Sequence, residues 1–126
     1  MGLKVLSTRE NQVMDVLWNS DKPLSAFQIS EGCSEMSVYS VQQVLKRLLK
    51  LEYVKVDHIG HSGKVLTRFY VPAISQPEYV CFLLGNSKKN IFQFASYIIT
   101  NDSDEDMLNE LKKLIDEQKR QTGEQA

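Results

Sequence analysis

Residues 24–50 read LSAFQISEGCSEMSVYSVQQVLKRLLK and contain two helix starts separated by a short turn. The first start is the capping box Ser25-Ala26-Phe27-Gln28, in which the serine hydroxyl accepts from a backbone amide and the glutamine reaches back to the cap. It predicts a short helix over residues 25–32. The second start is Ser37, after the four-residue turn 33–36. Two helices joined so briefly must cross steeply, which predicts a helix-turn-helix motif.

The second helix of this motif, over residues 37–51, is predicted to be amphipathic. Its apolar residues recur at the spacing of one helical stripe, and they are Val41, Val44, Leu45, Leu48 and Leu49. The opposite side carries Tyr39, Gln42, Gln43, Lys46 and Lys50. We therefore expect the stripe to enter the core and the polar side to remain accessible.

The flanking segments complete a small domain. Upstream, Ser7-Thr8-Arg9-Glu10 is another capping box and predicts a first helix. Downstream, residues 53–59 and 64–71 have the pattern of two strands, and Gly60-His61-Ser62-Gly63 is a turn. Three helices followed by a β-hairpin is the order of a winged-helix domain, which we place at residues 1–72, with the hairpin as the wing.

The remaining residues, 73–126, are predicted to form a helical dimerisation domain. After a connector at 73–78, the chain is apolar and aromatic, and residues 85–87 divide this stretch into two helices before a last helix that starts at Ser103. So few short helices cannot easily bury this apolar surface alone, so a second copy of the chain is the simplest partner. Folding back onto the N-terminal domain is the alternative. The expected dimer contacts are Ile91, Phe92, Phe94, Ala95, Ile98, Met107, Leu108, Leu111, Leu114 and Ile115. The fold class is thus mainly α with a small β-hairpin.

Composition and charge narrow the function. The chain has 126 residues, 42% of them hydrophobic and 25% charged, which is typical of a globular protein. No stretch has the length of a membrane span, and no signal peptide is recognised. Two widely separated cysteines, Cys33 and Cys81, indicate free thiols and a cytoplasmic protein. The net charge is −1, yet residues 46–70 carry six Lys or Arg against two Asp or Glu. Binding to nucleic acid would therefore use this basic window.

Several of these segments resemble the BlaI/MecI-type penicillinase repressors. The run from Leu6 to Trp18, LSTRENQVMDVLW, is similar to the opening of that family: a cap, a Glu three residues later, then Val-Met and a final Leu-Trp. Leu24-Ser25-Ala26 resembles their second helix, residues 37–50 resemble their recognition helix, and the hairpin that ends in Phe69-Tyr70 resembles their wing. The segment 108–115 is similar to their final dimerisation helix.

The resemblance implies a homodimeric cytoplasmic repressor that binds a double-stranded DNA operator of two inverted half-sites. Val38-Tyr39 stands where family members often have Pro-Lys, and Glu52 stands where many have Gly, so the operator sequence can differ from the usual one. Copper-responsive relatives carry a C-terminal cysteine motif, which this chain lacks. Relatives linked to β-lactam sensing are inactivated by proteolysis, and the matching bond would lie near Ser96-Tyr97, in a different local sequence.

Specific DNA contacts can be assigned to the polar side of the helix at 37–51. We expect base-edge contacts from Tyr39, Gln42, Gln43 and Lys46, because Gln can pair bidentately with adenine and Lys can donate to guanine. We expect phosphate contacts from Ser37, Ser40, Arg47 and Lys50. On the wing, the candidates are His61, Ser62, Lys64 and Arg68. For each residue, the alternative is a solvated surface position.

Catalysis, cofactors and metals have little support in the sequence. His58 and His61 form an H-x-x-H pattern, but they lie on or beside the wing tip and not on a metal-spaced helix face. No P-loop, dinucleotide fingerprint or nucleophile elbow is present. The alternative function is a winged-helix protein–protein interaction module without specific DNA binding.

Overall fold

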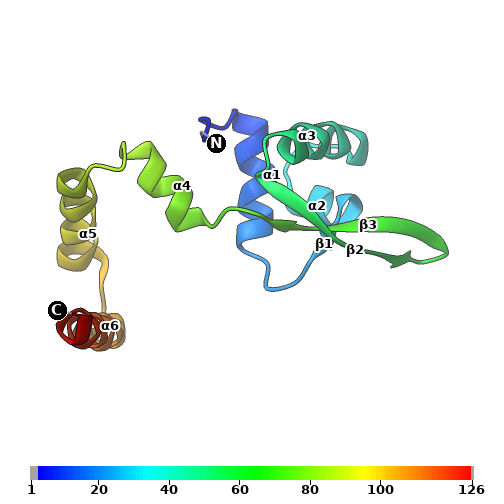
Figure 1. Cartoon of the computed structure of the whole chain (residues 1–126). Helices are drawn as coiled ribbons and strands as arrows, with labels where there is room; N and C mark the ends of the chain where they lie inside the picture. Colours follow the sequence, from blue (N-terminus) through cyan, green and yellow to red (C-terminus); the bar gives the residue numbers. More distant parts are fainter. Residues whose placement is uncertain (1–2, 126) are drawn as a thin grey trace. The chain divides into compact units, whose positions relative to one another are not determined.

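The computed structural model describes residues 3–125 of the chain, which form two compact units. The first unit ends at Leu83 and contains helices α1 (Thr8–Trp18), α2 (Ala26–Gly32), α3 (Val38–Lys50) and α4 (Gln76–Leu83), with strands β1 (Leu24–Ser25), β2 (Val54–Ser62) and β3 (Val65–Pro72) (Figure 1). The second unit begins at Leu84 and contains α5 (Lys88–Asp102) and α6 (Glu105–Gln125). This order confirms the predicted fold class, a mainly α winged helix followed by C-terminal helices.

Three serine caps begin the helices of the helix-turn-helix and the helix before it. Ser7 and Ser25 each form the full predicted capping box, with Glu10 and Gln28 as the returning side chains. Ser37 caps α3, since its hydroxyl accepts from the Ser40 amide at 3.1 Å. Local hydrogen bonding therefore sets where each of these helices starts.

One apolar core lies among α1, α2, α3 and the sheet. Its least exposed side chains come from every helix of this set and from the sheet: Val13, Met14, Leu17, Ile29, Val41, Val44, Leu45, Leu48, Tyr53 and Val54. The predicted stripe of α3 supplies four of them, while Leu49 is half-buried at the edge of the core. Burial of this stripe leaves the opposite side of α3 at the surface.

The sheet has three antiparallel strands in the order β1-β3-β2. The sequence does not predict the two-residue strand β1, which pairs Leu24 with Tyr70 and Ser25 with Phe69. The wing is also longer than predicted, because pairing continues to Ser62 opposite Val65, within the expected turn at 60–63. The chain instead reverses at Gly63, whose φ of +63° suits glycine.

A β-bulge interrupts the ladder between β2 and β3. Val56 pairs with Tyr70 and His58 with Phe69, so Asp57 is the extra residue. A bulge bends its strand and increases the local twist. It also returns Ile59, which pairs with Arg68, to the face that Val56 shares with Tyr70.

The segment after β3 differs from the predicted connector. Residues 76–78 already belong to α4, because Ser75 and Glu78 form a reciprocal cap: the Glu78 amide donates to Ser75 Oγ at 3.2 Å, and the Ser75 amide donates to Glu78 Oε1 at 3.1 Å. Tyr79 of α4 is buried in the first unit, and its hydroxyl accepts from the Leu6 amide at 2.8 Å. Contacts thus join α4 to the winged helix, so the first compact unit extends past the predicted domain boundary at 72/73.

The second unit opens with a turn at Leu84, Gly85 and Asn86, and the last two of these residues have positive φ. Ser87 caps α5 through the Asn90 amide. The last helix starts slightly later than predicted: the Met107 amide donates to Asp104 Oδ1 at 2.8 Å, so Asp104 and not Ser103 caps it. None of the helices in the described chain is both long and apolar enough to span a membrane.

Candidate nucleic-acid interface

The outer side of α3, opposite its buried stripe, is polar and accessible. Tyr39 is 70% exposed, and every other residue predicted for base or phosphate contacts on this helix is also exposed, apart from Ser40, which is half-buried. The predicted residues of this helix are Ser37, Tyr39, Ser40, Gln42, Gln43, Lys46, Arg47 and Lys50. The structure therefore gathers them on one accessible helix face.

The two serines at the start of α3 are already engaged with each other. Ser37 Oγ accepts from the Ser40 amide and donates to Ser40 Oγ, both at 3.1 Å, and Ser40 is half-buried. The amides of this first turn also carry the positive end of the helix dipole. An anion at this helix start would thus meet a pre-ordered cap.

The two lysines and the arginine of α3 differ in their surroundings. Within residues 3–125, neither Lys46 nor Lys50 takes part in an ion pair. Arg47, in contrast, lies with Nε 3.4 Å from Glu10 Oε2, and its side chain is 52% exposed. Lys46 and Lys50 are therefore uncommitted positive charges, whereas Arg47 also connects α3 to α1.

Glu10 contacts the candidate interface, and the sequence does not predict this contact. The sequence predicts Glu10 only as part of the α1 cap, yet its side chain is 3% exposed and bonds to Arg47 of α3. Burial alone would raise the pKa of Glu10, but hydrogen bonds from Ser7, the contact with Arg47 and the charge of Lys4 outweigh it and lower that pKa. No local sequence signal marks this contact, because the two residues meet only when α1 and α3 pack.

The wing places its predicted residues on different faces. His61 pairs with Leu66 and Ile59 with Arg68, and alternation along the strands puts these four on one face. Ser62 pairs with Val65 on the opposite face, and Lys64 lies in the turn. All four predicted wing residues are exposed. Figure 1 shows β2 and β3 running on as a ribbon past the helices of this unit.

The two histidines do not form a metal site with their neighbours. His58 Nδ1 lies 2.7 Å from Asp57 Oδ2, and its ring stacks on Phe69 with centroids 4.7 Å apart. Three residues apart on one strand, His58 and His61 point to opposite sides of the hairpin. Across the described residues, no group of three or more potential metal-ligating side chains is close enough to hold an ion.

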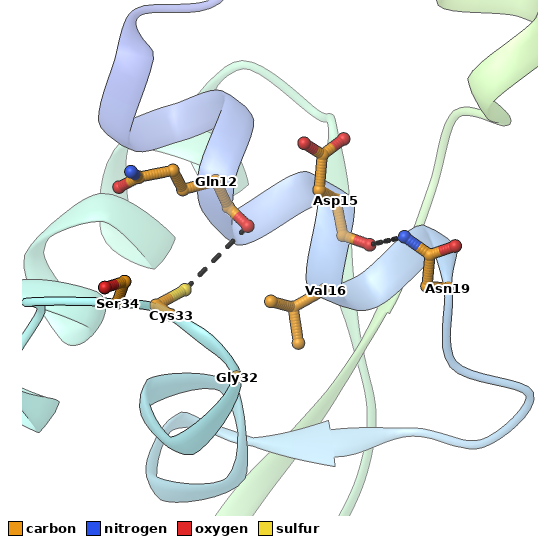
Figure 2. Close-up of a pocket in the computed structure, with 7 residues that line it drawn as sticks. All are labelled: Gln12, Asp15, Val16, Asn19, Gly32, Cys33 and Ser34. Atoms are coloured by element: carbon orange, nitrogen blue, oxygen red, sulfur yellow. Dashed lines mark hydrogen bonds between the residues drawn. The ribbon is translucent and has the colours of Figure 1, made fainter.

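An open cleft of about 520 Å³ lies between α1 and the turn that follows α2. Figure 2 shows its walls, with Gln12, Asp15 and Asn19 on the α1 side and Cys33 and Ser34 on the turn. The Cys33 thiol donates to the Gln12 carbonyl at 3.8 Å, and burial raises the pKa of that thiol. This cysteine is therefore a protonated packing residue at neutral pH and not an activated nucleophile.

The second unit exposes a large apolar surface. No described residue of α5 is buried, and Phe92, Phe94 and Tyr97 are exposed by 71%, 47% and 64%. The expected dimer contacts are all exposed or half-buried, namely Ile91, Phe92, Phe94, Ala95, Ile98, Met107, Leu108, Leu111, Leu114 and Ile115. The Ser96-Tyr97 bond lies inside α5. Large exposed apolar patches mark sites of association.

Comparison with protein-family models shows the family of this chain. The model described as penicillinase repressor matches residues 6–117, which include both units. That family is a family of regulators and not of enzymes, and its members are DNA-binding transcriptional repressors. No curated protein matches the chain.

Proposed function

We propose that this chain, which belongs to the penicillinase repressor family, is a sequence-specific repressor that binds an inverted-repeat operator as a homodimer. In this proposal, α3 enters the major groove and the wing contacts the flanking backbone or minor groove. The observation that supports it most is the outer side of α3. This side carries exposed glutamines and lysines, while the apolar stripe on the inner side of the same helix is buried in the core.

Base recognition falls to the N-terminal half and centre of α3. Gln42 and Gln43 are exposed amides that can pair bidentately with adenine, and Lys46 can donate to guanine. Tyr39 adds a large exposed ring one turn before them. Each good bidentate contact contributes about 1–3 kcal/mol of discrimination between bases.

The chain as a whole is slightly acidic, so its electrostatic attraction to DNA must come from a local group of positive charges. Neither Lys46 nor Lys50 takes part in an ion pair within the described chain, so their charges are available to DNA. A dimer presents this pair twice, which doubles the local attraction. The overall charge of −1 then has little influence at the contact surface.

Dimerisation is proposed through α5 and α6. Their apolar side chains are mostly at the surface of a single chain, and a two-fold symmetric partner would cover them with the same surface. A symmetric dimer places its two recognition helices on half-sites one DNA turn apart, or a multiple of it, at about 10 base pairs per turn. Repression follows because the occupied operator blocks transcription.

The test is fluorescence anisotropy on a labelled duplex from the intergenic DNA upstream of the chain's own gene, compared with an unrelated duplex at several salt concentrations. We expect preferential binding to the first duplex that weakens linearly in log salt. Lys46→Ala/Lys50→Ala should weaken binding and, because Lys50 is the member of the pair assigned to a phosphate, reduce the salt slope by roughly 2 for the dimer, at about 0.9 for each phosphate that is no longer neutralised. This pair is preferred to Arg47, whose removal would also leave Glu10 buried without its partner.

The matched control is Lys88→Ala/Lys89→Ala, a pair of lysines at the surface of the first turn of α5. It removes the same charge from each chain but lies outside the proposed DNA surface. An equal reduction of the slope in both variants would show that only net charge matters and would contradict a binding surface on α3.

A protein–protein interaction module is the second candidate. The observation that favours it is the 70% exposure of Tyr39 on a face that is otherwise polar. Equal and weak binding to both duplexes, unaffected by Lys46→Ala/Lys50→Ala, would support this candidate. In that case Tyr39→Ala should reduce capture of the partner, because an aromatic anchor would carry much of the contact.

A further inference from the structure

Glu10 combines two contacts on its two carboxylate oxygens. Oε1 accepts from the Ser7 amide at 2.8 Å and closes the cap of α1. Oε2 accepts from Arg47 Nε at 3.4 Å, on the helix that we propose reads DNA. The residue itself is only 2% exposed.

The cap alone does not require a carboxylate. In the same unit, Gln28 performs the identical task for α2. Its side-chain Oε1 accepts from the Ser25 backbone amide at 2.9 Å, and its backbone amide donates to Ser25 Oγ at 3.2 Å. A buried carboxylate is costly unless it is paired and hydrogen-bonded. The cap can be made without a charge, so the contact with Arg47 is what distinguishes Glu10 from Gln28.

Arg47 has donors left after this contact. A guanidinium carries five N–H groups in a fixed fork, of which Nε provides one. In the described chain, the two terminal nitrogens have no hydrogen-bond partner, and the side chain is 52% exposed. Arg47 also follows Gln43 by one helical turn and precedes Lys50 by three residues, so it lies within the accessible face of α3.

We propose that Glu10 is a positioning residue for DNA binding: by holding Nε of Arg47, it fixes the guanidinium so that the two terminal nitrogens meet a backbone phosphate. This inference rests on the proposed function and adds to it a role for a residue of α1. Because arginine can use one edge for a carboxylate and the other for a phosphate, a single side chain connects the first helix, the recognition helix and the DNA.

The inference makes a prediction opposite to that of simple charge counting. Removing a carboxylate near a DNA-binding surface should strengthen binding through weaker repulsion. If Glu10 positions Arg47, however, Glu10→Gln should weaken operator binding about tenfold, the scale of one charge-assisted hydrogen bond. The cap should survive, since Gln28 shows that glutamine can supply it.

The experiment compares wild type, Glu10→Gln, Arg47→Ala and the double variant by anisotropy on the operator duplex over a salt series. Fluorescence of Trp18 confirms that each variant is folded at the assay temperature. The matched control is Glu31→Gln, an exposed carboxylate on α2 with no ion pair in the described chain, which should bind as wild type or slightly tighter.

We expect Arg47→Ala to reduce the salt slope by about 0.9 for each phosphate that it ceases to neutralise, and the double variant to bind no more weakly than Arg47→Ala alone. Unchanged or tighter binding by Glu10→Gln would overturn the positioning role, as would additive effects in the double variant or an unchanged slope in Arg47→Ala. Those results leave the proposed function standing if wild type still prefers the operator. A wild-type chain without that preference would overturn both.

Discussion

Replacing Tyr79 by Phe removes one hydroxyl from the point where α4 joins the winged-helix unit. That hydroxyl accepts from the Leu6 amide at 2.8 Å in a buried position, so the substitution leaves a buried N–H without its acceptor. An unsatisfied buried donor costs about 1–3 kcal/mol. The ring contacts with Trp18 and Tyr53 stay available, so we expect a decrease in stability of about 1.5 kcal/mol, near the lower end of that range.

This decrease in stability corresponds to a lower urea concentration at the midpoint of unfolding. For a small domain with an m value of about 1.5 kcal/mol per molar urea, a decrease of about 1.5 kcal/mol lowers the midpoint by about 1 M. The slope of the transition should not change, because the same surface becomes exposed on unfolding.

Tryptophan fluorescence is the suitable assay. The chain has one tryptophan, Trp18, whose ring centroid lies 5.7 Å from that of Tyr79 and whose Nε1 donates to the Ile74 carbonyl at 2.9 Å. The signal therefore follows the first unit and not the association of α5 and α6. Tyr39→Phe is the control, because an exposed hydroxyl should change stability by no more than about 0.5 kcal/mol. Equal midpoints for wild type and Tyr79→Phe would refute the claim that this hydrogen bond anchors α4.

Three further predictions concern titration, thiol reactivity and association. Because hydrogen bonds from Ser7 and the contact with Arg47 lower the pKa of Glu10 on folding, these interactions stabilise the protein above the unfolded pKa of about 4.3 and are lost as pH falls through the folded value, so the stability advantage of wild type over Glu10→Gln should shrink in acid unfolding titrations. A chromogenic disulfide reagent at neutral pH should label half-buried Cys81 before Cys33, whose pKa is raised by burial; faster labelling of Cys33 would contradict its packing role. Phe92→Asp/Leu114→Asp should raise the dimer dissociation constant at least about 100-fold in sedimentation equilibrium, because charges would be buried at the proposed interface; an unchanged constant would place the interface elsewhere.

The parts of the fold that sequence reasoning predicts are those specified by neighbouring residues. The boxes Ser7–Glu10 and Ser25–Gln28 are recognisable because cap and returning side chain lie three residues apart. The start of α4 has the same signal in Ser75 and Glu78, and that signal could have corrected the expected connector. The polar side of α3 is predictable for a related reason: it is the complement of an apolar stripe with helical spacing.

The features that escape prediction depend on residues far apart in the chain. Strand β1 has two residues and no pattern of its own, and it exists because Leu24 and Ser25 pair with β3. The contact of Glu10 with Arg47 spans 37 positions and needs α1 and α3 to be packed. The DNA contacts themselves stay predictions, since exposure of a side chain makes it available and does not identify its partner.

The bulge at Asp57 has a consequence for how the wing can vary. The strand keeps its partners on β3 on both sides of the bulge, so Asp57 contributes bend and twist but no pairing. Loss of that single codon would therefore straighten the hairpin while Val56 stayed opposite Tyr70 and His58 opposite Phe69. The direction in which the wing projects can thus change without a change in the pairing of β2 with β3. Under the proposed function, a change in the direction of the wing would bring it to a different stretch of DNA while the core stayed the same.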